Sequence, residues 1–140
     1  MRPTPINEEV TFEDVGVKNR PVISKTDLKG IITFVNSAFC KLAGYSKEEL
    51  IGQPHNIVRH PDMPKAIFKE MWNTIERGET FRGFVKNLRK DGKYYWVEVF
   101  IEPMFDEHGA KVGYISARKE ISESDKEKYE KLYQEMKKEE

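Results

Sequence analysis

Three strand-like segments joined by two tight turns occupy the C-terminal half of this chain, and they limit the fold more than any other feature. Residues 80–88 and 93–105 flank Lys90-Asp91-Gly92, a sequence typical of a hairpin turn. Residues 111–121 follow a second turn at His108-Gly109. Short connections of this kind join antiparallel neighbours. The sequence therefore predicts an antiparallel sheet to which this half supplies three strands.

The N-terminal half contributes two more predicted strands and then a short helix. Residues 21–30 and 31–36 are rich in β-branched residues and are separated by turn-forming residues. Asn36 or Ser37 can cap a helix that follows, and Gly44 can end it in the left-handed conformation. The predicted sheet thus has five strands.

Further helices are predicted between the two groups of strands. Ser46-Lys-Glu-Glu49 is a capping box, which indicates one helical turn. Farther on, Asp62 is expected to cap a longer helix, with Pro64 in its first turn and Gly78 after its end. The apolar side chains of this helix recur at helical spacing, at Ile67, Phe68, Met71, Trp72 and Ile75.

A charged helix is predicted at the C-terminus. Ser124-x-x-Glu127 is a second capping pattern, and the apolar residues that follow it lie on one helical face, at Tyr129, Leu132, Tyr133 and Met136. So short a helix is marginal in water and needs a partner surface. Packing on its own domain and dimerisation are the two alternatives.

The order of elements predicts an α+β fold, a five-stranded antiparallel sheet with short helices packed on one face and an added C-terminal helix. We assign residues 1–20 to an N-terminal lead-in or cap, 21–121 to the folded domain and 122–140 to the C-terminal helix. Between the sheet and the helices we expect a pocket, where a ligand would sit.

Composition excludes several classes of protein. Lys plus Arg and Asp plus Glu are equal at 24 each, so no overall charge favours nucleic acid or anionic lipid. No stretch approaches the roughly 18 apolar residues that a membrane span needs, and residues 1–14 do not resemble a signal peptide. Cys40 is the one cysteine and cannot form an internal disulfide. We therefore expect a cytoplasmic protein.

The sequence contains no recognisable catalytic or metal-binding motif. Paired carboxylates, a nucleophile elbow and a phosphate-binding glycine loop are absent from the sequence, so we expect no enzyme. His55, His60 and His108 lack the further ligands of a zinc pattern. A single axial histidine leaves a haem-binding oxygen sensor as an alternative.

Two stretches resemble the halves of a PAS domain. The first is Gly30-Ile-Ile-Thr-Phe-Val-Asn36-Ser-Ala-Phe39 with Gly44-Tyr-Ser46 and Glu49-Leu-Ile-Gly52. The second is Arg89-Lys-Asp-Gly-Lys-Tyr-Tyr-Trp96 with Gly113-Tyr-Ile-Ser116. The resemblance covers residues 21–121 and implies the PAS fold.

A longer string narrows this resemblance. Gly52-Gln-Pro-His-Asn-Ile-Val-Arg-His-Pro-Asp-Met-Pro-Lys-Ala66, with Met71-Trp72 and Val85-Lys-Asn87 downstream, is similar to the PAS domain of bacterial aerotaxis (energy-taxis) receptors. That resemblance implies non-covalent FAD, with FMN as an alternative, and transfer of the redox signal to a chemoreceptor-type partner. It also implies a homodimer formed through the N-terminal cap or the C-terminal helix, with membrane association through the receptor partner as an alternative.

Seven residues are candidates for cofactor binding. The resemblance singles out Arg59-His60-Pro61-Asp62: Arg59 offers a guanidinium fork to a phosphate or to ring carbonyls, His60 a donor, and Asp62 a group that orients Arg59 or caps the next helix. The remaining four are Asn36, Trp72, Phe81 and Asn87.

These four carry different expectations. Asn87, if it faces inward from its strand, presents an amide that can donate to or accept from a flavin N5. Asn36 is equally explained as a helix cap. Trp72 and Phe81 are candidate ring walls, although Phe81 stands where the aerotaxis pattern has a tryptophan. Cys40 lies outside the segment that carries the adduct-forming cysteine of blue-light flavin domains, so we expect no adduct photochemistry.

A second function class remains beside the flavin sensor. A PAS domain without a cofactor can act as a dimerisation or docking module, and nothing in the sequence alone excludes it. Such a module predicts a protein without a chromophore whose self-association depends on residues 122–140.

Overall fold

The computed structural model describes residues 2–140. Five strands form one antiparallel sheet in the order β2-β1-β5-β4-β3. The predicted α+β fold, with its five antiparallel strands and a C-terminal helix, is confirmed. In chain order the elements are β1 Val22–Thr26, β2 Ile32–Val35, α1 Ser37–Ala43, α2 Lys47–Leu50, the 3-10 helix η1 His55–Val58, α3 Lys65–Glu76, β3 Phe81–Leu88, β4 Tyr94–Phe105, β5 Lys111–Glu120 and α4 Glu123–Lys138.

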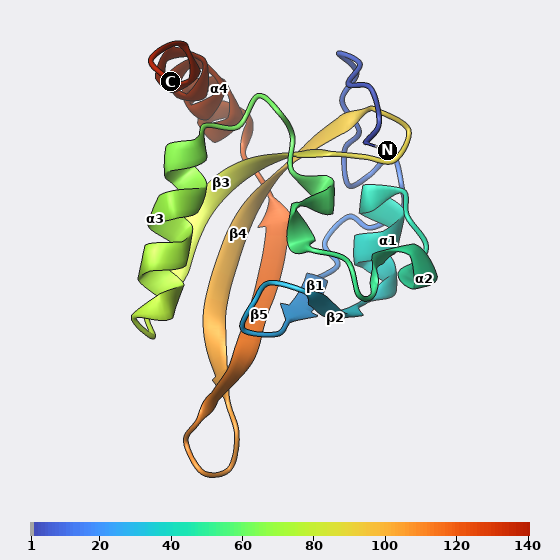
Figure 1. Ribbon diagram of the computed structural model, residues 1–140. Coiled ribbons are helices and arrows are strands. Elements are labelled where there is room, and N and C mark those ends of the chain that lie inside the picture. Colours follow the sequence, from blue (N-terminus) through green and yellow to red (C-terminus); the bar gives the residue numbers. More distant parts are fainter. Residues whose placement is uncertain (1) are drawn as a thin grey trace.

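The short helices cover one face of the sheet at its two ends. Figure 1 shows α3 beside β3 and β4, and α1 and α2 beside β1 and β2. Side chains alternate between the faces of a strand, and Val97, Val99 and Ile101 of β4 point to this helix-covered face, which we term the inner face. Trp96 and Glu98 then lie on the opposite, outer face.

Local capping explains how the first two helices begin. Asn36 accepts a hydrogen bond from the Phe39 amide at 3.0 Å and is the N-cap of α1. Gly44 ends this helix with a positive φ of 77°, a conformation that glycine adopts without strain. Ser46 and Glu49 form the predicted capping box.

Two predicted helix starts are wrong by a few residues. Asp62 does not cap α3, because Pro64 holds the extended conformation at the N-cap and the helix begins at Lys65. The N-cap of α4 is Ser122 instead of Ser124, and its side chain accepts from the Asp125 amide at 3.1 Å.

Helix α4 packs on the outer face of its own sheet. The Tyr133 hydroxyl donates to the Phe84 carbonyl at 2.7 Å, and Tyr129 stacks on the Phe84 ring with centroids 4.3 Å apart. Leu132, predicted to belong to the apolar face, is 44% exposed. Of the two alternatives for this helix, packing on its own domain is the one that the structure shows. No helix within residues 2–140 has the length and apolarity to cross a membrane.

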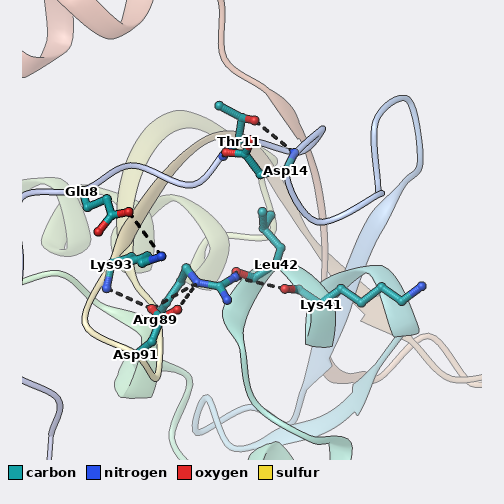
Figure 2. Close-up of polar contacts among 8 residues, drawn as sticks. All are labelled: Glu8, Thr11, Asp14, Lys41, Leu42, Arg89, Asp91 and Lys93. Atoms are coloured by element: carbon teal, nitrogen blue, oxygen red, sulfur yellow. Dashed lines mark hydrogen bonds and ion pairs between the residues drawn. The ribbon is translucent and has the colours of Figure 1, made fainter.

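The N-terminal segment packs against the β3–β4 hairpin. The Ile6 amide donates to the Gly92 carbonyl at 2.9 Å, and the Val10 amide donates to the Tyr94 carbonyl at 2.8 Å. Phe12 and Val17 are buried in the core. In Figure 2 the same hairpin is tied to the segment by the Glu8–Lys93 ion pair.

Arg89 joins this hairpin to α1. Its guanidinium donates to the carbonyls of Lys41 and Leu42 at the end of the helix and pairs with Asp91 (Figure 2). A cation at a helix C-terminus satisfies carbonyls that have no partner within the helix. Arg89 is therefore a structural arginine, with an anionic partner in Asp91.

Candidate functional site

A cavity of about 400 Å³ lies between the inner face of the sheet and the helices. This volume falls within the range of small-molecule sites in proteins. The residues lining it come from β1, β3, β4 and β5 on the sheet side and from the β1–β2 turn, η1 and α3 on the other: Thr26, Lys29, Gly30, Pro54, His55, Asn56, Val58, Arg59, Phe68, Met71, Trp72, Ile75, Val85, Asn87, Val97, Val99, Ile101, Tyr114, Ser116 and Arg118.

Two opposed walls of the cavity are apolar or aromatic. Valines and Ile101 of β3 and β4 form the sheet side, and the apolar stripe of α3 forms the other. Trp72 meets Tyr114 edge to face, with centroids 5.8 Å apart. Gly30 is required beside the indole, because a Cβ there would lie 3.1 Å from Trp72 Cζ2. Walls of this kind suit a flat ring system.

The cavity carries a polar cluster made by buried Arg118 and Ser24, on β5 and β1, and partly buried His55, on η1. The Arg118 side chain donates to His55 Nε2 at 3.0 Å, and Ser24 Oγ lies 3.0 Å from the same nitrogen. Burial, and then the Arg118 cation, lower the pKa of His55 to about 3, so the imidazole is neutral and accepts. Burial lowers the pKa of Arg118 to about 10, which still leaves it charged at neutral pH.

Arg59 presents a second guanidinium to the cavity. It lies over the Phe68 ring, 3.7 Å from the centroid, and its Nε is buried without a hydrogen-bond partner. Burial, together with the nearby Arg2 cation, lowers its pKa. Arg2 also donates to the carbonyls of Asn56 and Arg59, which fastens this part of the wall to the N-terminal segment.

Asn87 faces the cavity from the edge strand β3. It is 5% exposed and lies directly opposite Tyr95 of β4. Burial raises the pKa of Tyr95 to about 12, so the phenol stays neutral. The backbones of Asn87 and Arg59 form an isolated antiparallel bridge. The strand that carries the amide is therefore paired with the loop that carries the guanidinium.

The structure separates the seven candidate residues into two groups. Arg59, Trp72 and Asn87 line the cavity, and cofactor contact by these three remains a prediction. The side chains of the other four are not part of the lining; these are Asn36, His60, Asp62 and Phe81.

Each of the four has another role in the fold. Asn36 uses both side-chain atoms, accepting from the amides of Phe39 and Ile23 and donating to the Pro21 carbonyl. Phe81 is buried at the start of β3, with its ring over Gly83, where a Cβ would lie 2.6 Å from the ring.

His60 and Asp62 brace the loop before α3. The Asp62 amide donates to His60 Nδ1 at 3.0 Å, while the Asp62 carboxylate pairs with Lys86 Nζ at 3.1 Å. Burial and the Lys86 cation lower the pKa of His60 to about 4. Lys86 lies on the outer face of β3, so this loop contacts both faces of the sheet at its edge.

Among the polar cavity residues that were not sequence candidates, His55 and Arg118 stand out because they are hydrogen-bonded to each other. His55 was considered only as a metal or haem ligand. Arg118 alternates with Tyr114 and Ser116 along β5, and this two-residue period places it on the inner face. An arginine on the inward side of a strand was the signal that could have identified it.

The fold and the site match a known family. A family model described as the PAS fold matches residues 32–118. The chain belongs to the PAS family. The PAS region is 47% identical over 112 residues to the aerotaxis receptor of Escherichia coli K12, which confirms the resemblance found in the sequence. This alignment covers 80% of the chain and 22% of the receptor, so the chain spans about a fifth of that relative's length.

Solved structures agree with this assignment. The PAS domain of a Colwellia psychrerythraea protein is 30% identical, with a TM-score of 0.61, over 72% of this chain and 86% of that one. A light-oxygen-voltage domain studied with a flavin analogue is 26% identical, with a TM-score of 0.69, over 80% of this chain and 84% of that one. The chain is thus a PAS sensor domain related to a receptor and to a light-oxygen-voltage domain.

The cavity fits a flavin by its own chemistry. Within residues 2–140, Arg59 Nε and Arg118 Nη1 are buried without a hydrogen-bond partner, and both residues line the cavity. Buried polar groups are normally hydrogen-bonded, so two orphaned donors beside a cavity indicate a ligand with acceptor atoms. A flavin combines carbonyl and nitrogen acceptors on one edge with a flat apolar body, which matches the walls of this cavity.

Proposed function

We propose that this PAS domain holds a flavin in its cavity and reports the redox state of that flavin to a signalling partner. The observation that carries the proposal is a cavity with apolar and aromatic walls beside which two buried guanidinium nitrogens have no partner. A bound flavin supplies reversible electron and proton uptake. The protein itself contributes binding and signalling, without turnover of a substrate.

The chain's own residues hold the ring and face its polar edge. Trp72 and the β4 valines pack on the flat faces, while Asn87, Arg59 and Arg118 meet the acceptor atoms. An amide both donates and accepts, so Asn87 can adapt to a change in protonation at a neighbouring atom. Because Asn87 is bridged to Arg59, such an adaptation reaches the loop that contacts Lys86 on the outer face.

FAD is the cofactor that we propose, with FMN as the alternative. Lys29, Pro54 and Asn56 are the exposed residues of the cavity lining and mark its mouth. A dinucleotide can extend its hydrated phosphates through such a mouth, beside the Lys29 cation. The similarity to the aerotaxis receptor supports a chemoreceptor-type partner and a cytoplasmic location, with dimerisation as part of signalling.

The test begins with the purified protein. It should be yellow or become yellow when FAD or FMN is added, and mass spectrometry of the released chromophore identifies which flavin is held. Arg59→Ala should lower the flavin-to-protein ratio without unfolding the domain. The matched control is Arg77→Ala, because Arg77 is exposed and pairs only with Glu79.

Two results would contradict the proposal. A colourless protein that takes up neither flavin leaves the cofactor-free docking module as the function. Full flavin loading of the Arg59→Ala variant would remove Arg59 from the binding site.

A further inference from the structure

Arg118 is a buried cation without an anionic partner. It lies on β5, the central strand of the sheet, and is 6% exposed. Its Nη2 donates to His55, and its Nη1 is buried without any hydrogen-bond partner. Among residues 2–140, no carboxylate forms an ion pair with this guanidinium.

The groups around Arg118 do not neutralise it. The His55 imidazole is neutral, and the Phe39 ring lies 5.0 Å from the guanidinium carbon. The buried phenol of Tyr95 also remains uncharged. These contacts satisfy part of the guanidinium and leave its charge uncompensated, which is destabilising for a folded domain. A buried guanidinium with an unused donor can instead serve a bound ligand, whose acceptor atoms supply the missing hydrogen bond.

We propose that Arg118 Nη1 donates to the carbonyl-rich edge of a planar heterocycle bound in the cavity, and that it does not bind a phosphate. This inference rests on the proposed function, within which the edge is that of the flavin pyrimidine ring. Arg118 is thereby assigned as a ligand-binding residue. In the ligand-free protein its buried charge lowers the free energy of unfolding.

The location of Arg118 favours a ring edge over a phosphate. On β5 it is paired with Val22 on one side and Val99 on the other, at the centre of the sheet. Lys29, Pro54 and Asn56 are the cavity residues exposed to solvent, whereas Arg118 itself is only 6% exposed. Phosphates are strongly hydrated and suit exposed residues, whereas a guanidinium buried in the sheet suits a desolvated ring edge.

The first experiment compares flavins that share the isoalloxazine ring but differ in what extends from it: no phosphate in riboflavin, one phosphate in FMN, and a pyrophosphate with adenosine in FAD. Affinities of wild-type protein and Arg118→Met for riboflavin, FMN and FAD are measured by fluorescence titration. Arg118→Met should weaken all three by a similar factor of roughly 10 to 100, the worth of one hydrogen bond to a charged group. Arg118→Lys should recover part of the loss. A loss confined to FMN and FAD, with riboflavin unchanged, would assign Arg118 to phosphate and overturn the proposal.

The second experiment measures the ligand-free proteins by urea denaturation. Arg118→Met should be at least as stable as wild type, because it removes a buried, uncompensated charge and leaves Ser24 to pair with His55. Arg89→Met is the matched control: its guanidinium bonds to carbonyls at the end of α1 and to the Asp91 carboxylate (Figure 2), so its loss should lower stability and leave riboflavin affinity unchanged. If Arg118→Met lowers the free energy of unfolding as much as Arg89→Met does, Arg118 is structural and the proposal fails.

Failure of this inference is distinguishable from failure of the proposed function. If the wild-type protein binds none of the three flavins, the proposed function is wrong, and the flavin ring cannot be the ligand of Arg118. A wild-type protein that binds them, together with an Arg118→Met variant of equal affinity, contradicts only the role of Arg118.

Discussion

Single buried side chains set the chemistry of this domain. His55 has a neutral imidazole because burial and the cations of Arg118 and Arg59 disfavour its protonated form. Its ordinary pKa is 6.5 and its pKa in the folded protein is about 3. At a pH between these two pKa values, His55 is protonated in the unfolded chain and neutral in the folded protein.

The consequence is a loss of stability in acid. As pH falls from 6.5 to 5, His55 should lower the free energy of unfolding by about 1–2 kcal/mol, and the loss continues toward pH 3. The variant His55→Gln, whose amide oxygen can still accept from Arg118, should lose less stability over the same range. Urea denaturation at pH 7 and pH 5 measures both proteins, and equal acid sensitivity would contradict this account. His60, whose pKa is lowered in the same direction, accounts for acid sensitivity that remains in the variant.

Local sequence predicted some site residues and missed others for a physical reason. Trp72 and Asn87 were found because helical and strand periodicity determine which face a residue occupies. Asn36 was left between two roles, and its hydrogen bonds show it to be a cap. Arg118 and His55 meet only because β5 pairs with β1 beneath η1. That contact joins positions 63 residues apart, which no local pattern contains.

At the scale of elements, the loop before α3 links the cavity to α4. Met63 Sδ accepts from the Lys86 amide at 3.4 Å, and Lys137 of α4 lies 3.5 Å from the Met63 carbonyl. The start of α3 was predicted wrongly because Pro64, in the extended conformation, takes the N-cap position that the sequence suggested for Asp62. The strands and the hairpin were predicted well because their signals are local.

Helix α4 is expected to be held by a few specific contacts. The Tyr133 hydroxyl is its buried hydrogen bond to the sheet, so Tyr133→Phe should lower the free energy of unfolding by about 1 kcal/mol. Amide hydrogen exchange should rise along α4, while flavin affinity stays unchanged because Tyr133 lies on the outer face. Leu132→Ala, at an exposed position of the same helix, should change stability by less than about 0.5 kcal/mol. Unchanged exchange in Tyr133→Phe would show that other contacts hold the helix.

At the scale of the whole molecule, residues near both ends of the chain contact the stretch between η1 and α3. Arg2 donates to carbonyls of Asn56 and Arg59, and Lys137 approaches the carbonyl of Met63. The stretch from η1 to α3 therefore contacts the N-terminal segment, α4 and the edge of the sheet. A ligand that orders this stretch should stabilise all three together, since each packs against it.

Ligand-linked stability tests this arrangement. At a free FAD concentration 100 times Kd, binding adds about 2.7 kcal/mol to the free energy of unfolding, which corresponds to a rise in Tm of roughly 10 °C for a domain of this size. Hydrogen exchange should slow in residues 55–64 and also in the N-terminal segment and α4, although neither lines the cavity. The control is Val99→Trp, which places an indole in the cavity and should abolish the FAD-dependent rise. Protection confined to the cavity lining, with both ends unchanged, would show that these contacts do not couple the chain ends to the site.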